Sequence, residues 1–158
     1  MARDVDMARP LTRTLVSGSV LSAVTAGALA LLARAEGRGA LQPVNATSHW
    51  YRGSAAGRVR AADARHTLLG FVTHHAASVF WAGIFQAARR LHPARAPVVD
   101  ALAVSALAAV VDYGLVPKRL TPGWETALPP RSVALAYAAM AVAFLATCPP
   151  RQQQRDRP

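Results

Sequence analysis

Four blocks of apolar residues, separated by polar and basic segments, set the pattern of this sequence. They cover residues 15–33, 66–88, 98–116 and 133–147. An α-helix rises about 1.5 Å per residue, so a block of roughly 20 residues crosses the hydrocarbon core of a membrane. The last block is shorter and needs the long side chain of Arg131 to reach the surface. No block alternates apolar and polar residues with a period of two, which excludes the strands of a membrane barrel.

The pattern predicts an all-α fold, an integral membrane four-helix bundle forming a single domain over residues 1–148. The expected helices cover about 13–33, 64–90, 98–116 and 131–147. The long polar first loop between the first two helices should lie partly at the membrane interface. A short basic turn joins the second and third helices, which should form the tightest hairpin. The tail at residues 149–158 is expected to be disordered.

The first apolar block combines features of a packing helix and of a signal peptide. Gly18, Ser22, Ala26 and Ala30 recur every four residues, a small-residue stripe that lets membrane helices approach closely. The small residues around Arg34 resemble a cleavage site, but the apolar run exceeds the roughly 7–15 residues of a signal core. This length favours a retained helix.

Charge and composition narrow the class of protein. The chain is 53% hydrophobic and only 16% charged, unlike a soluble enzyme core. Its net charge of +10 comes from 18 Lys and Arg residues that lie almost wholly between the apolar blocks. We therefore expect a lipid bilayer with anionic headgroups, not nucleic acid, as the partner. The single cysteine, Cys148, excludes a disulfide within the chain.

The polar segments contain the residues expected at the lipid headgroups. These residues are Arg52, Arg58, Arg60, Arg65, Trp50 and Trp124. Tryptophan suits this position because its ring is apolar and its N–H is polar. Basic residues divide evenly between the two sides of the predicted bundle, so they decide its orientation only weakly, and we expect cytoplasmic termini.

The second apolar block carries the candidate site. It contains no Asp, Glu, Lys or Arg, yet His74 and His75 lie within a turn of its midpoint, where a polar side chain facing lipid is costly. At about 100° per residue, His74 shares a helix face with Asp63 and Gly70 and has His66 at its margin. His75 points about a quarter-turn away. We therefore expect His74 to face the bundle interior.

The third block offers partners for these side chains. Ser105 and Asp112 lie on one face of it, among alanines. Because the third helix should run antiparallel to the second, Ser105 is level with His74, and Asp112 is level with His66. The sequence predicts these two pairs, with Asp63 near the second.

Three interpretations of the histidines stay open. In the first, they are hydrogen-bonded packing residues that hold membrane helices together. In the second, His66, His74 or His49 provides imidazole ligands to a metal or haem in a redox protein, with Asp63 or Asp112 as carboxylate. His66 and His74 lie about 12 Å apart along one helix, so they cannot share one ion directly.

The third interpretation is an accessory subunit for proton or ion handling. His74 and Asp112 would titrate within the membrane, while His49 and Glu125 in the polar segments would collect protons at its surface. Asn45 belongs to the same polar surroundings, and a glycosylation pattern beginning there is too short to carry weight. The sequence contains no GxSxG, HExxH, P-loop or GxGxxG motif, so it names no reaction and no cofactor.

Three stretches carry a resemblance to a known group of proteins. They are PVNATSHWYRG from Pro43, HTLLGFVTHHAASVFWA from His66 and DYGLVPKRLTPGWE from Asp112. Together they resemble a group of small, functionally uncharacterised four-helix inner-membrane proteins of bacteria. The resemblance implies location in a bacterial inner membrane, with multiple spans. It implies no activity, and a homo-oligomer or a membrane partner subunit stays open.

Overall fold

The computed structural model describes residues 2–148, and in that range the chain is helical and has no strand. The all-α prediction is therefore confirmed for the described residues, whereas the predicted disordered tail lies outside them. The long helices are α1 (Ala2–Ala35), α4 (Leu69–Leu91), α5 (Pro97–Val110) and α6 (Pro130–Ala146). Two π-helical turns extend them: η2 (Ala64–Leu68) leads into α4, and η3 (Val111–Leu115) follows α5.

Helix α1 differs most from its predicted bounds. It begins at Ala2, not near residue 13, and it includes Pro10. Each residue added to an existing helix gains one hydrogen bond, so the apolar block extends its helix into the polar segment before it. With 34 residues, α1 is roughly 51 Å long, well beyond the roughly 30 Å of a hydrocarbon core.

Three helices are long and apolar enough to cross a membrane by length and composition. They cover Arg9–Ala35, Ala64–Leu91 and Pro97–Leu115. The fourth apolar helix, α6, has 17 residues and is shorter than each of these three spans, as the sequence predicted for its block.

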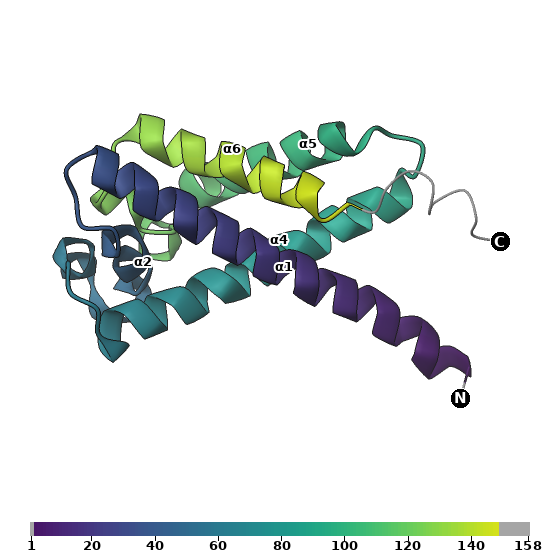
Figure 1. The fold of residues 1–158 in the computed structure, drawn as a ribbon, viewed down its shortest axis with the longest axis horizontal. Coiled ribbons are helices and arrows are strands. Elements are labelled where there is room, and N and C mark those ends of the chain that lie inside the picture. The colour runs from purple at the N-terminus through teal and green to yellow at the C-terminus, as the bar shows by residue number, and fades with distance from the viewer. Residues whose placement is uncertain (1, 149–158) are drawn as a thin grey trace.

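Helices α1 and α4 cross each other, and α5 and α6 lie to one side of this crossing (Figure 1). The crossing is close because Gly18 faces Val79, where an added Cβ would lie 2.6 Å from the Val79 Cα. Helix α1 packs most extensively against α4 and α6, and α4 packs less extensively against α5. The expectation that α4 and α5 form the tightest hairpin is wrong, because the small residues of α1 permit a closer approach than the short turn enforces.

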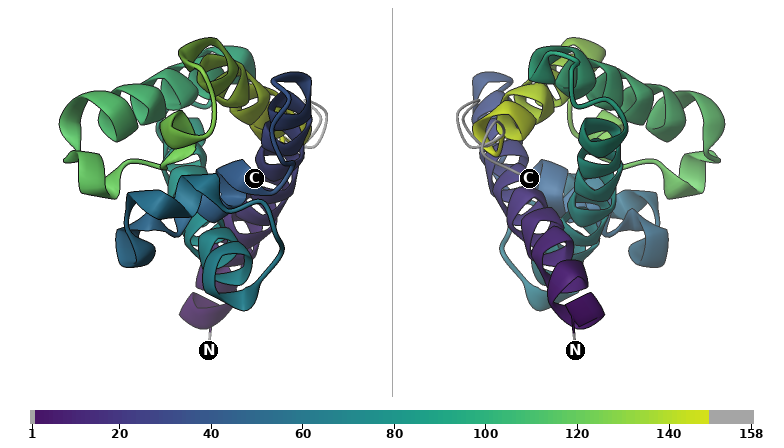
Figure 2. Two further views of the ribbon diagram at one scale, coloured as in Figure 1. Left: turned by 90° about the vertical axis from the view of Figure 1, so that its left-hand side faces the viewer. Right: turned by 90° about the vertical axis from the view of Figure 1, so that its right-hand side faces the viewer.

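The long polar loop is folded, and with the segment before α6 it forms a layer at one end of the helices (Figure 2). We call residues 42–61 and 118–128 the cap. Its elements are α2 (Gln42–Thr47), α3 (His49–Arg52), η1 (Ser54–Arg58), η4 (Lys118–Leu120) and η5 (Trp124–Thr126). Every residue of α2 is buried, so this part of the predicted loop packs inside the protein.

The buried polar side chains of α2, such as Gln42, are tolerated because their hydrogen bonds are satisfied. The Gln42 side chain accepts from Gly39 N at 2.7 Å and donates to Gly57 O at 3.1 Å. Gly123 adopts a left-handed conformation, φ +82°, and an added Cβ there would lie 2.6 Å from both Ala46 O and His49 Nδ1. The two halves of the cap are thus in tight contact.

Ion pairs tie the helix ends together. At the end opposite the cap, the buried carboxylate of Asp100 accepts from Arg89 at 2.6 Å and Arg95 at 3.1 Å. At the cap end, Glu36 accepts from Arg131 and from Ser132 Oγ at 2.8 Å. The bonds from Arg131 and then Ser132 hold the pKa of Glu36 below its ordinary value. These contacts fix α1 to α6 and α4 to α5.

Candidate functional site

A pocket of about 540 Å³ lies among α1, α4, η3, α6 and the cap. Most of its lining is apolar and aromatic, including all three tryptophans of the chain, Trp50, Trp81 and Trp124. Two candidate residues, His74 and Asp112, contribute polar groups to the same lining. An apolar cavity of this size with a few polar groups is typical of a small-molecule binding site.

His74 is buried, as the sequence predicted, but its partners lie on α1 and not on the third apolar helix. Its Nε2 lies 3.2 Å from Ser22 O and 3.0 Å from Thr25 Oγ1. The hydroxyl of Ser105, its expected partner, makes no hydrogen bond within residues 2–148. Helical periodicity indicated which face is buried, but it could not indicate which helix covers that face.

These contacts determine where His74 carries its proton. A backbone carbonyl only accepts, and the Thr25 hydroxyl already donates to Leu21 O at 2.7 Å. Nε2 must therefore be protonated and donate toward α1. In a neutral imidazole this leaves Nδ1 as a hydrogen-bond acceptor, and no group in the described part of the chain donates to it.

Asp112 is half-buried and accepts a hydrogen bond from Tyr137 Oη of α6 at 2.7 Å. The predicted pair of Asp112 with His66 does not form. A row of ring contacts instead connects this carboxylate to His74: Trp124 lies 5.6 Å from Tyr137 and 5.9 Å from His74 between ring centroids. His74 and Asp112 therefore belong to one wall of the pocket, joined by residues of the cap and α6.

Trp124 is 6% exposed, which corrects its assignment to the lipid headgroups. The tight turn at Gly123 directs the ring into the protein, and its Nε1–H is buried without a hydrogen-bond acceptor in the described residues. Trp50 is half-buried and donates from Nε1 to Thr121 O at 2.8 Å. The four arginines assigned to headgroups, Arg52, Arg58, Arg60 and Arg65, are all exposed.

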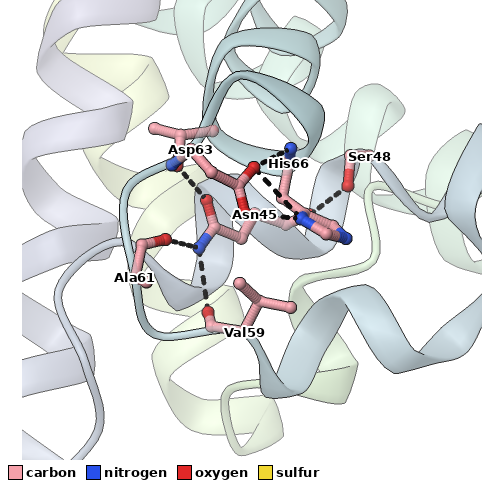
Figure 3. Close-up of polar contacts among 7 residues, drawn as sticks. Asn45, Ser48, Val59, Ala61, Asp63 and His66 are labelled. Atoms are coloured by element: carbon pink, nitrogen blue, oxygen red, sulfur yellow. Dashed lines mark hydrogen bonds and ion pairs between the residues drawn. The ribbon is translucent and has the colours of Figure 1, made fainter.

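Asp63 and His66 form a separate cluster with Asn45 at the start of the second apolar span (Figure 3). Asp63 is the N-cap: its Oδ1 accepts from His66 N at 2.6 Å, and its Oδ2 lies 2.9 Å from His66 Nδ1. The hydrogen bond from the His66 side chain holds the pKa of Asp63 below its ordinary value. This cluster begins a helix and does not reach the pocket lining.

Asn45 fixes this helix start to the cap. Its Nδ2 donates to Val59 O at 2.8 Å and Ala61 O at 3.1 Å, and its Oδ1 accepts from Thr67 at 2.7 Å. Because Asn45 is fully buried and its amide is used internally, the residue has a structural role.

The other candidates lie apart from the pocket. His49 bonds Ala46 O at 2.9 Å and Lys118 O at 3.4 Å, and joins the two halves of the cap. His75 is half-buried and stacks on Phe71. Glu125 is exposed and accepts from Thr121 Oγ1 at 2.6 Å. Across residues 2–148, no three His, Cys, Asp or Glu side chains come close enough to hold a metal ion together.

Exposed apolar side chains form the mouth of the pocket. Val72, Ala76 and Phe80 recur every four residues along α4, line the pocket and are exposed on the outer surface of the helix. The exposed Tyr51 and Leu120 of the cap continue this rim. The pocket thus opens sideways along an apolar helix face, beneath the cap.

No family model matches the chain, and neither a curated protein nor a solved structure matches it. The residues of the pocket are therefore interpreted from their own chemistry. Sequence reasoning missed Thr25, Trp124 and Tyr137 as members of the site. A tyrosine in an alanine-rich helix was one usable signal, because a buried Tyr hydroxyl requires a partner.

Proposed function

We propose that this chain is an integral membrane protein, a four-helix bundle that binds a lipid-soluble small molecule in the pocket beneath its cap. One observation carries the proposal: a cavity of about 540 Å³ opens through the exposed apolar rim of α4, and His74, Trp124 and Asp112 lie on its inner wall. In a bilayer, this rim faces the hydrocarbon region. A lipid-soluble molecule then enters sideways without passing through water.

We place the protein in a bacterial inner membrane, as the sequence resemblance implies, with both termini cytoplasmic. The cap is then the polar layer at the opposite surface. Its exposed Arg52, Arg58 and Arg60, with Arg65 beside it, support binding of anionic lipid, each at about 1 kcal/mol near the headgroups. A homo-oligomer or a further membrane subunit is compatible with this arrangement.

The alternatives from the sequence receive less support from the site. A metal or haem centre needs ligands that converge, and His66 and His74 belong to different clusters. Proton handling needs a connected path of titratable groups. His49 is bonded to the cap carbonyls of Ala46 and Lys118 and lies outside the pocket lining, so it does not extend the wall formed by His74 and Asp112.

The test uses energy transfer from tryptophan to a polyene. All three tryptophans line the pocket, so a bound polyene accepts their emission energy. The protein in lipid nanodiscs is titrated with axerophthene, the hydrocarbon analogue of retinol. We expect transfer that saturates near one probe per protein. Transfer that only grows in proportion to the probe in the lipid would contradict the proposal.

A pair of alanines on α4 gives the matched control. Ala76 lies on the pocket rim, whereas Ala87 is exposed on the same helix outside the pocket. Ala76→Phe should weaken axerophthene binding about tenfold because the larger ring fills the mouth. Ala87→Phe should leave it unchanged. If the two variants bound axerophthene with equal affinity, the probe would bind outside the pocket.

A further inference from the structure

Two neighbouring residues of the pocket wall, Trp124 and His74, each have a hydrogen-bonding group that no other described residue uses. The donor is the buried Nε1–H of Trp124, which has no acceptor within residues 2–148. The acceptor is Nδ1 of His74, because Nε2 donates toward α1. Both residues line the pocket, and their rings are neighbours, with centroids 5.9 Å apart in an edge-to-face arrangement.

We infer that the ligand is a neutral lipophilic alcohol or phenol, whose hydroxyl accepts from Trp124 Nε1–H and donates to His74 Nδ1. A hydroxyl is the smallest group that does both at one oxygen atom. A buried N–H without a partner is costly, so a ligand that satisfies it gains affinity over one that does not. This inference rests on the proposed function, because it identifies the ligand of the same pocket.

The charges around the pocket argue against an anionic headgroup. No Lys or Arg lines it, whereas Asp112 does. A carboxylate or phosphate would enter an apolar space beside a carboxylate without a balancing cation, at a high desolvation cost. A lipophilic cation would suit Asp112 but would leave the Trp124 N–H without an acceptor. A neutral hydroxyl satisfies both groups of the wall.

The test compares four polyenes of the same shape in the energy-transfer titration: retinol, retinyl methyl ether, axerophthene and retinylamine. Affinities are expressed per mole of probe in the nanodisc lipid, so that differences in partitioning cancel. Retinol should bind about tenfold more tightly than axerophthene, and the ether should fall between them because it accepts but cannot donate.

Substitutions assign the preference to the two side chains. Trp124→Phe and His74→Gln should each reduce the preference for retinol over axerophthene, because the first removes the donor and the second replaces Nδ1 while keeping an N–H toward Ser22 O. Ala87→Phe is the control, because Ala87 is exposed on α4 outside the pocket. It should leave the preference unchanged.

The outcomes separate the two proposals. If axerophthene binds saturably and Ala76→Phe weakens this binding, the result supports a ligand site in the pocket. This holds whichever headgroup the site prefers. Equal affinity for all four probes, equal affinity for the alcohol and its ether, or tighter binding of retinylamine would overturn the assignment of an alcohol. Absence of saturable binding by any probe would overturn the proposed function itself.

Discussion

The role of a residue in this protein depends on the neighbours that it contacts. His74 is stabilised by Ser22 and Thr25 of α1, so its depth in the helix indicated its burial but not its partner. Gly70 shows the same limit. It shares the His74 face, as the sequence indicated, but the neighbour that covers it is α2: an added Cβ would collide with the Val44 carbonyl oxygen.

Two glycines should respond to alanine in opposite directions. Gly70→Ala should destabilise the protein, because overpacking against backbone costs about 1–3 kcal/mol and exceeds the helix-propensity gain of up to about 1 kcal/mol. Gly27→Ala should stabilise it by up to about 1 kcal/mol, because Gly27 is helical and nothing lies within 4 Å of an added Cβ. Thermal unfolding in detergent measures both. A stabilising Gly70→Ala would show that α2 and α4 separate easily.

At the scale of elements, the block pattern predicted the long helices well and the polar segments poorly. Long apolar runs indicate helices directly, so η2 with α4, α5 with η3, and α6 begin and end within one residue of their predicted bounds. The cap was missed because its polar residues are buried through specific hydrogen bonds, such as those of Asn45. Such bonds join positions far apart in sequence and leave no periodic signal.

The start of the second span should depend on pH through Asp63. His66 lowers the pKa of this N-cap carboxylate from its ordinary 3.8, so Asp63 binds protons more weakly in the folded state than in the unfolded state. The stabilisation that Asp63 provides is fully present above pH 3.8. It is lost as the pH falls through the lower pKa that Asp63 has in the folded state.

Asp63→Asn separates charge from capping, because Asn is also a good N-cap residue. The melting temperature of the native protein should exceed that of Asp63→Asn at about pH 7. The difference should shrink at about pH 3, below the ordinary pKa of 3.8, because Asp63 then binds a proton more readily in the unfolded state than in the folded state. Thermal scans of both proteins at the two pH values measure it. A difference that stays constant would show that the carboxylate charge contributes nothing to this helix start.

At the scale of the whole molecule, the helices place the cap at one end and the α4–α5 turn at the other (Figure 1). The C-terminal end of α6 lies toward the turn, where Thr147 meets Ser17 of α1 at 2.9 Å. In a membrane, this arrangement separates the cap from both the turn and the end of α6. The lateral pocket then lies in the half of the bilayer nearer the cap.

Reporter fusions should therefore give opposite results at the two ends. Alkaline phosphatase fused after Arg58 in the cap should be active, because that side faces the periplasm in the proposed orientation, and green fluorescent protein at the same position should be dark. Both results should reverse for fusions to the full-length chain. A fusion after Ala94, in the α4–α5 turn, is the control and should behave like the full-length fusion, since turn and C-terminal end share one side. If cap and turn gave the same result, the chain could not cross the membrane between them, and the lateral entry of a lipid-soluble ligand would lose its basis.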